Sequence, residues 1–246
     1  MARTHGASLT MAMAVMLAVA VALLVAQTGA ELTQVEHTPK TEGSLAILAI
    51  GDWGRRGQFN QTLVAEQMGV VGEKMDIDFV ISTGDNFYDD GIANTSDPLF
   101  TESFTNIYTA DGLQKPWYIV LGNHDYTGNA LAQQDPAIRD VDSRYNSVNK
   151  SFIKHGVDIY LNGHDHCLQR ITSADSPLQL LTSGGGSKAW AGKFKATSDK
   201  LEFLYDGQGF MSMLLSTTDA ELAFYDVTGT VLHNWAINKT ASADGL

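Results

Sequence analysis

The chain has 246 residues, of which 44% are hydrophobic and 18% are charged, a composition that supports a sizeable core and argues against general disorder. Its 28 Asp and Glu against 16 Lys and Arg give a net charge of −12, which argues against a general nucleic-acid-binding protein, because such proteins need a basic face for phosphates. The single cysteine excludes a disulfide framework and a cysteine-cluster metal site.

The N-terminal region is typical of a secretory signal peptide. An uncharged apolar run at residues 11–26 follows Arg3, and small residues occupy positions 28–30. We therefore predict a signal peptide over residues 1–30, a polar lead-in over residues 31–43 and export of the product. An uncleaved signal anchor is the alternative.

Four Asn-x-Ser/Thr triplets fit an exported chain as glycosylation candidates. They begin at Asn60, Asn94, Asn149 and Asn238. Cys167 would be unpaired in such a chain, either as a small buried residue beside a strand end or as a cysteine that has lost its partner.

Short apolar runs predict strands that alternate with helices in the first part of the chain. Strands are expected at residues 45–50, 78–82, 117–121 and 157–161. Apolar residues at helical spacing predict a helix over residues 59–75 and another that begins after Asp97, a typical N-cap residue. Later strands are expected at residues 178–182, 210–215, 222–227 and 231–237, with a hairpin turn at Thr228-Gly229. The pattern indicates a mixed α/β domain over residues 44–246.

Each of the first four predicted strands ends in a glycine followed by Asp, Asn or His. The sequences are GDWG, GDNFY, GNHD and GHDH. Because ligands bind at the carboxyl ends of strands in open α/β sheets, we expect their polar residues to surround one crevice. These residues are Asp52, Asp85, Tyr88, Asn123, His124, His164 and His166. Oxygen and imidazole ligands without thiolate suit Fe, Mn or Zn, and a phenolate favours Fe(III). Any one of them alone would be read as a cap or packing residue.

In this order the four motifs resemble those of the purple acid phosphatases, a family within the metallophosphoesterases. The small plant type is similar in the segments ILAIGDWGRRGQ, VISTGDNFYDDG, LGNHDY, NGHDHCLQ and TSGGGSKAW. The resemblance extends from about Leu45 to the C-terminus with one interruption. It implies a metallophosphoesterase-like two-sheet sandwich flanked by helices.

The resemblance also implies roles for individual residues. The family's ferric ligands match Asp52, Asp85, Tyr88 and His166, and the ligands of a second divalent ion (Zn, Mn or Fe(II)) match Asp85, Asn123 and His164, so that Asp85 would bridge the two ions. His124 matches the family's outer-sphere catalytic histidine, which binds phosphate together with Asn123 and assists proton transfer.

One family motif, Val-x-x-His, is missing between the third and fourth motifs. Only 40 positions separate His124 from His164, and His155, the one histidine between them, has no such setting. The chain therefore looks like a family member that lacks a central segment near residues 145–146, which leaves the fold incomplete and removes one ligand of the divalent ion.

Two functions follow from the resemblance. The first is a secreted acid phosphatase (extracellular, cell wall or vacuole) that hydrolyses small phosphate monoesters with metal-activated hydroxide, without nucleic acid and without a membrane after signal cleavage. The alternative is a shortened, non-catalytic or weakly active isoform that binds at most the ferric ion. A phosphodiesterase is a third reading, against which Tyr88 argues.

Overall fold

The computed structural model describes residues 37–148, 158–172, 178–194 and 200–238. The predicted signal peptide, Asn149 and His155 lie outside these ranges. Within them, no helix combines the length and the apolar character needed to cross a membrane.

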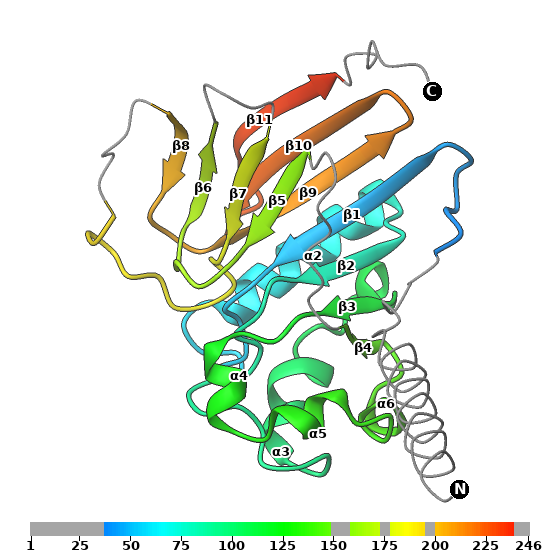
Figure 1. Ribbon diagram of the computed structural model, residues 1–246, viewed down its shortest axis with the longest axis vertical. Helices are drawn as coiled ribbons and strands as arrows, with labels where there is room; N and C mark the ends of the chain where they lie inside the picture. Colours follow the sequence, from blue (N-terminus) through cyan, green and yellow to red (C-terminus); the bar gives the residue numbers. More distant parts are fainter. Residues whose placement is uncertain (1–36, 149–157, 173–177, 195–199, 239–246) are drawn as a thin grey trace, which may run out of the picture. The chain divides into compact units, whose positions relative to one another are not determined.

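Strands and helices alternate first, and antiparallel strands follow (Figure 1). The strands are β1 (Ser44–Ile50), β2 (Phe79–Ser82), β3 (Trp117–Ile119), β4 (Tyr145–Ser147), β5 (Ile159–Asn162), β6 (Leu168–Ile171), β7 (Gln179–Ser183), β8 (Leu201–Tyr205), β9 (Gly209–Ser216), β10 (Asp219–Asp226) and β11 (Val231–Asn238). The α-helices are α2 (Gln61–Met75), α3 (Pro98–Phe100), α4 (Asn123–Thr127), α5 (Ala130–Gln134) and α6 (Ile138–Val141). All eight predicted strands are present, and β4, β6, β8 and the short helices α4 to α6 were not predicted.

The strands form two sheets, which confirms the expected fold class. The larger has the order β11-β10-β9-β1-β2-β3-β4, in which β1 to β4 are parallel and β9 to β11 are antiparallel. The smaller has the order β5-β7-β6-β8. In Figure 1 the arrowheads of β1, β2, β3 and β5 point toward the same lower-left part of the molecule. The loops that carry the four motifs therefore leave their strands at one end.

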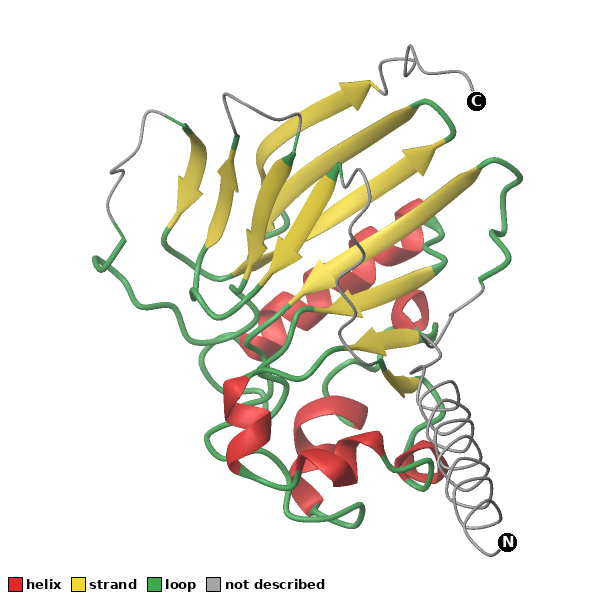
Figure 2. Cartoon of the chain, viewed as in Figure 1, coloured by secondary structure: helices red, strands yellow, loops and turns green. Residues whose placement is uncertain are grey.

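Strand β1 lies at the centre of the packing because its residues are apolar on both faces. Leu48 and Ile50 pack with Met68 of α2 in one core cluster, whereas Ile47 and Ala49 belong to a second cluster that includes residues of the smaller sheet. The larger sheet is thus covered by helix on one side and by the smaller sheet on the other, and Figure 2 shows α2 lying along it.

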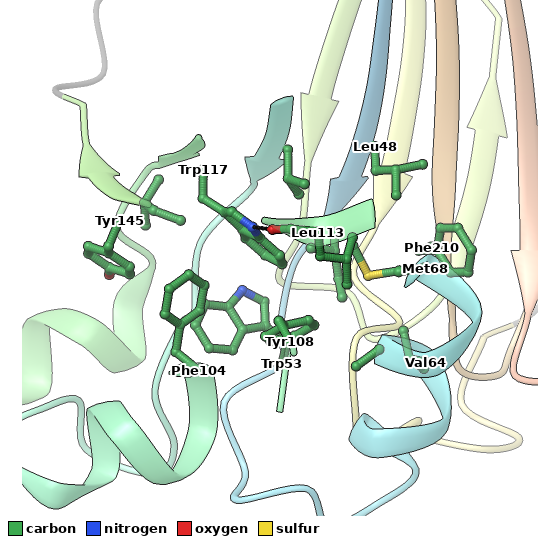
Figure 3. Close-up of a cluster of buried hydrophobic side chains, with 14 of the residues drawn as sticks. Leu48, Trp53, Val64, Met68, Phe104, Tyr108, Leu113, Trp117, Tyr145 and Phe210 are labelled. Atoms are coloured by element: carbon green, nitrogen blue, oxygen red, sulfur yellow. Dashed lines mark hydrogen bonds between the residues drawn. The ribbon is translucent and has the colours of Figure 1, made fainter. Parts of the chain in front are cut away.

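Large aromatic side chains fill the helix side of the core beneath the motif loops (Figure 3). Trp117 of β3 lies 4.7 Å from Tyr108 and 5.1 Å from Phe104 between ring centres. Trp53 is fully buried among them, and its indole N–H donates to Ser82 Oγ at 2.9 Å. Trp53 therefore packs the core and does not line the crevice.

The helix predicted after Asp97 begins as expected but is not a regular α-helix. Asp97 caps α3 by accepting a hydrogen bond from Leu99 N–H at 2.9 Å. The chain then widens into a π-helical turn over Thr101–Thr105, with Phe100 and Phe104 buried on either side of its start. Single π-helical turns of this kind are rare and occur mostly within α-helices.

Strand β5 departs from the prediction of four buried strands. Tyr160 is 41% exposed, and the other residues of β5 are half-buried. The physical reason is position: β5 is the edge strand of the smaller sheet, as β4 is of the larger one. The predicted join near residues 145–146 lies within β4. The next strand along the chain after this edge strand of the larger sheet is β5, which is an edge strand of the smaller sheet.

Candidate metal centre

Three of the predicted ligands follow a glycine and adopt a backbone conformation that non-glycine residues rarely use. The φ angles are 61° for Asp52, 51° for Asp85 and 74° for His164. Left-handed conformations outside glycine cost energy and cluster at functional sites. The strand-end loops therefore hold these side chains at a cost in local stability.

Four side chains meet in the enclosed part of the site. The Tyr88 hydroxyl donates to Asp52 Oδ1 at 2.9 Å, and it also lies 3.4 Å from Asp85 Oδ2 and 3.0 Å from His166 Nε2. His166 Nε2 is 3.3 Å from Asp52 Oδ1. These four residues are the predicted ferric ligands, and their donor atoms converge on one point.

A backbone contact on the side of the ring away from the carboxylates fixes the orientation of His166. Its Nδ1 faces the backbone carbonyl oxygen of Lys188, to which it donates. The other nitrogen, Nε2, is then free of a proton in the neutral ring and is directed at the carboxylates. Protein metal sites use this arrangement to set the tautomer of a histidine ligand.

A cation would relieve the electrostatic strain in this cluster. Asp52 and Asp85 are both buried, and no Lys or Arg in the described part of the chain forms an ion pair with either. Burial raises the pKa of Asp52, and burial together with the two carboxylates raises the pKa of Tyr88. Within the described residues, no group of three or more His, Cys, Asp or Glu has the arrangement of a bound ion. The donors hydrogen-bond to one another, and the carboxylate, phenol and imidazole set suits a hard ferric ion.

The second half of the predicted centre is open to solvent. The side-chain amide of Asn123 lies 2.8 Å from His164 Nδ1, which is 4.0 Å from Asp85 Oδ2. The side chain of His164 is 70% exposed, against 4% for His166. Two further candidate ligands, Asn123 and His164, thus adjoin Asp85, but solvent reaches this half of the site.

Glycines allow the loops to approach the carboxylates. A Cβ on Gly122 would lie 2.1 Å from Asp85 Oδ1, and one on Gly163 would lie 2.5 Å from Asp52 Oδ2. Backbone N–H groups just beyond these glycines donate to the carboxylate oxygens: His164 N donates to Asp52 Oδ2 at 2.8 Å, and His124 N donates to Asp85 Oδ1 at 2.9 Å. The glycines of the third and fourth motifs are therefore required for this close approach.

His124 lies at the solvent side of the cluster. Its ring centre is 4.4 Å from that of Tyr88, and its backbone N–H donates to Asp85 Oδ1 at 2.9 Å. Its Nδ1 contacts the backbone oxygen of Asp89. Since a carbonyl oxygen can only accept, Nδ1 carries a proton, and Nε2 remains available to a ligand.

Sequence reasoning assigned no role to Asp125, the last residue of the GNHD motif. This buried carboxylate accepts hydrogen bonds from the backbone N–H groups of Asn86, Phe87 and Gly122 and from the side chain of Gln133, at 2.8–3.2 Å. It therefore ties the loop that carries Asp85 to the loop that carries His124. Its position in the GNHD motif was the only indication of a role that the sequence offered, because most of its hydrogen-bond donors come from other segments of the chain.

Two further residues border the cluster. The Arg55 guanidinium carbon lies 3.6 Å from the centre of the Tyr88 ring, while Arg56 is exposed and pairs with Glu102 at 2.7 Å. One of the two arginines, Arg56, is thus solvated. Trp190 is half-buried and stacks on the His166 ring at 4.5 Å between ring centres, so it forms a wall of the site.

The remaining predictions concern surface residues and Cys167. Asn60, Asn94 and Asn238 are exposed, as glycosylation would require, and modification of them stays a prediction. Cys167 is fully buried and free, which agrees with the interpretation as a small buried residue.

Known proteins that resemble this chain place it in a class of phosphoesterases. The calcineurin-like phosphoesterase family matches residues 45–199 of this chain, which agrees with the two-sheet fold and the motif loops at one end. Purple acid phosphatase 4 of Arabidopsis thaliana is 38% identical, with 96% of each chain covered, and Purple acid phosphatase 3 is 42% identical, with 84% of this chain and 81% of the relative covered. The chain therefore belongs to the purple acid phosphatases, and the family makes it an acid phosphatase.

A solved structure supports the fold independently. Purple acid phosphatase PPD1 from yellow lupin (Lupinus luteus) seeds superimposes with a TM-score of 0.58 at 13% identity, over 82% of this chain and 55% of that one. At this identity the likeness concerns the fold alone.

The length of the alignment bears on the missing segment. The match to Purple acid phosphatase 4 extends over 326 positions, while this chain has 246 residues, so at least 80 positions have no counterpart here. Both chains are covered almost throughout, so the difference is internal. This agrees with a family member that lacks an internal segment, and the location of the join stays a prediction.

Proposed function

We propose that this chain is a secreted phosphatase for phosphate monoesters with an unequal dinuclear centre, in which a ferric ion is held firmly and a divalent ion loosely. The observation that carries the proposal is the contrast between His166, which is enclosed and oriented from behind, and His164, whose side chain projects into solvent. The absent Val-x-x-His motif would remove a further ligand from the open half only.

The four enclosed residues would hold the ferric ion, and Asp85, Asn123 and His164 would hold the divalent ion. When bound, two such ions supply charge stabilisation at the phosphoryl oxygens and a lowered pKa of water. This chain's own residues would orient the ester: the Asn123 amide and the Nε2 atom of His124 both face the solvent side, where a phosphate group can enter. His124 is the residue positioned to move a proton at the leaving group.

The decisive measurement combines metal content with activity. The protein is dialysed against metal-free buffer, its iron and divalent metal are quantified, and hydrolysis of p-nitrophenyl phosphate at acid pH is followed as Zn²⁺, Mn²⁺ or Fe²⁺ is added. We expect about one retained iron per chain and activity that rises and saturates with the added ion.

A pair of histidine variants assigns the two halves. His166→Ala should lose the iron, whereas His164→Ala should keep the iron and raise the concentration of divalent ion needed for half-maximal activity by at least about 10- to 100-fold, the loss that is typical even for partners of metal ligands. Two firmly retained ions per chain would contradict the proposed inequality. Retained iron without phosphatase activity at any metal concentration would instead support the shortened, non-catalytic isoform.

Export belongs to the same proposal and rests on the apolar run at residues 11–26. Expression in a eukaryotic secretory host, with N-terminal sequencing of the protein in the medium, tests it. A product that begins near residue 31 is expected, and retention of the whole chain in the cell would argue against export.

A further inference from the structure

Two cationic side chains from different loops meet on one exposed aromatic ring beside the candidate metal centre. The Arg55 guanidinium carbon lies 5.6 Å from the centre of the Phe59 ring, and Lys188 Nζ lies 5.3 Å from the same centre. Arg55 follows the GDWG motif directly, and the backbone oxygen of Lys188 orients His166. Both loops therefore belong to the wall of the site.

The Phe59 ring is exposed at the surface and does not pack in the core. The residue is 48% exposed, and its backbone has φ 52°, a left-handed conformation that bulky residues avoid. Its neighbours Arg56 and Asn60 have φ 53° and 64°, so the loop is strained over several residues. Such strain persists where the surroundings impose it, often at ligand sites. Here the ring faces two cations, which is an attractive arrangement for its π electrons.

Both cations have unused capacity for hydrogen bonds. Lys188 has an exposed side chain and no ion pair with any described residue. Arg55 is only 12% exposed and pairs with Asp89 through one nitrogen at 3.0 Å, but its buried Nε–H has no partner among the described residues. A buried donor without a partner costs stability unless a ligand accepts its hydrogen bond.

Two cationic side chains lie close together here in an acidic chain, although Asp89 offsets part of the charge of Arg55. The protein has a net charge of −12, yet these two cations lie beside a pair of buried carboxylates without forming ion pairs with them. Arg55 is in contact with the Tyr88 ring at 3.6 Å, so the pair of cations adjoins the centre at which a phosphate would be cleaved.

We propose that Arg55 and Lys188, held by Phe59, form a binding site for a second anionic group of the substrate. Compounds with two neighbouring phosphate groups, of which inorganic pyrophosphate is the simplest, fit this arrangement: one phosphate binds at the metal centre and the other between the two cations. The inference deepens the proposed function by assigning residues that select among phosphate compounds. The anion-binding part of it does not require turnover.

Isothermal titration of the full chain with pyrophosphate and with orthophosphate tests the proposal. Lys188→Gln should weaken pyrophosphate binding by about tenfold, the loss expected for one charged hydrogen bond, and should change orthophosphate binding less than about twofold. The matched control is Lys193→Gln, because Lys193 is exposed on the same loop and makes no ring contact within the described residues. Since chelation of metal by pyrophosphate affects both variants equally, the difference between them is the measure.

A second variant separates binding from loop structure. Phe59→Leu removes the π face but keeps an apolar side chain, and it should also weaken pyrophosphate selectively while the thermal unfolding midpoint stays unchanged. Equal weakening of both anions, or no weakening of pyrophosphate by Lys188→Gln, would overturn the proposal. If the wild-type chain binds pyrophosphate with this selectivity but hydrolyses no phosphate ester, the anion site stands and the proposed catalytic function fails.

Discussion

Replacing Asp125 with Asn gives a direct test of how the motif loops are held together. The carboxylate is fully buried and accepts hydrogen bonds from the backbone N–H groups of Asn86, Phe87 and Gly122 and from the amide of Gln133. An Asn in the same place keeps one acceptor oxygen and turns an NH2 group toward N–H donors. The backbone N–H donors belong to the two loops that the carboxylate joins, and they have no partner in any described helix or strand that could replace the lost acceptor.

The expected cost follows from the contacts of one oxygen. Oδ2 accepts from Gly122 N–H at 2.8 Å and from the Asn86 side chain at 3.0 Å. Leaving a buried donor without a partner costs about 1–3 kcal/mol. Two such donors predict a loss of about 2–6 kcal/mol in the free energy of unfolding. That is a large part of the total of about 5–15 kcal/mol that is typical of domains.

Urea unfolding followed by circular dichroism measures this loss, and Asp90→Asn is the matched control because Asp90 is exposed on the adjacent loop. The control should lie within about 0.5 kcal/mol of wild type, as surface substitutions usually do. If Asp125→Asn is equally mild, the carboxylate does not join the two loops in the way described. A loss of iron at denaturant concentrations that leave the far-ultraviolet signal unchanged would show that the loops separate before the sheets unfold.

Three further predictions concern single groups. Although burial opposes ionisation of Asp142, the hydrogen bonds and charge of Arg144 hold its pKa below the usual 3.8. The ionised carboxylate therefore stabilises the fold above pH 3.8, and this contribution is lost as the pH falls through the lowered pKa. Asp142→Asn should lower the thermal unfolding midpoint relative to wild type at about pH 6 and should differ little from wild type near pH 2. A difference between the two proteins that does not change with pH would contradict this. Tyr88→Phe removes only a hydroxyl and should abolish the visible absorption band of the iron-loaded protein, and a band that survives would exclude this phenolate as the ligand. Burial raises the pKa of Cys167 to about 12, so a maleimide should label it at pH 7.5 only after unfolding, and rapid labelling of the folded chain would show that the thiol is accessible.

The elements that sequence patterns predicted are those whose own residues determine them. β1 is apolar along its length and helix α2 has its apolar residues at helical spacing, so each could be located without knowledge of its neighbours. β4 is different: Tyr145–Ser147 is short and partly polar, and it is a strand because it pairs in parallel with Trp117–Ile119. The π-helical turn over Thr101–Thr105 is a further difference, because the helical spacing of Phe100 and Phe104 predicts a helix but not its widened turn.

The same distinction applies to the site. The seven motif residues could be named because each follows a strand and a glycine, and the structure brings them together. The contacts that orient them could not be named, since they join segments far apart in the chain. Arg55 reaches Tyr88, and Trp190 stacks on His166, through tertiary packing alone. Sequence therefore predicts which atoms would bind, whereas the structure is needed to show which of them are enclosed.

The enclosed and open halves of the centre also differ in how they depend on the shortened region. Asp52 and Asp85 come from loops after β1 and β2, in the interior of the larger sheet, and His166 is fixed by the loop of Lys188. His166 shares the loop after β5 with His164, but it lies further along, near the start of β6, and the Lys188 carbonyl holds its ring. His164, in contrast, follows β5 directly, where the neighbouring strand would be absent and the side chain is exposed. Removal of a segment between these edges should therefore weaken the divalent position and leave the ferric position intact, which is why we expect metal content, and not folding alone, to separate this chain from its longer relatives.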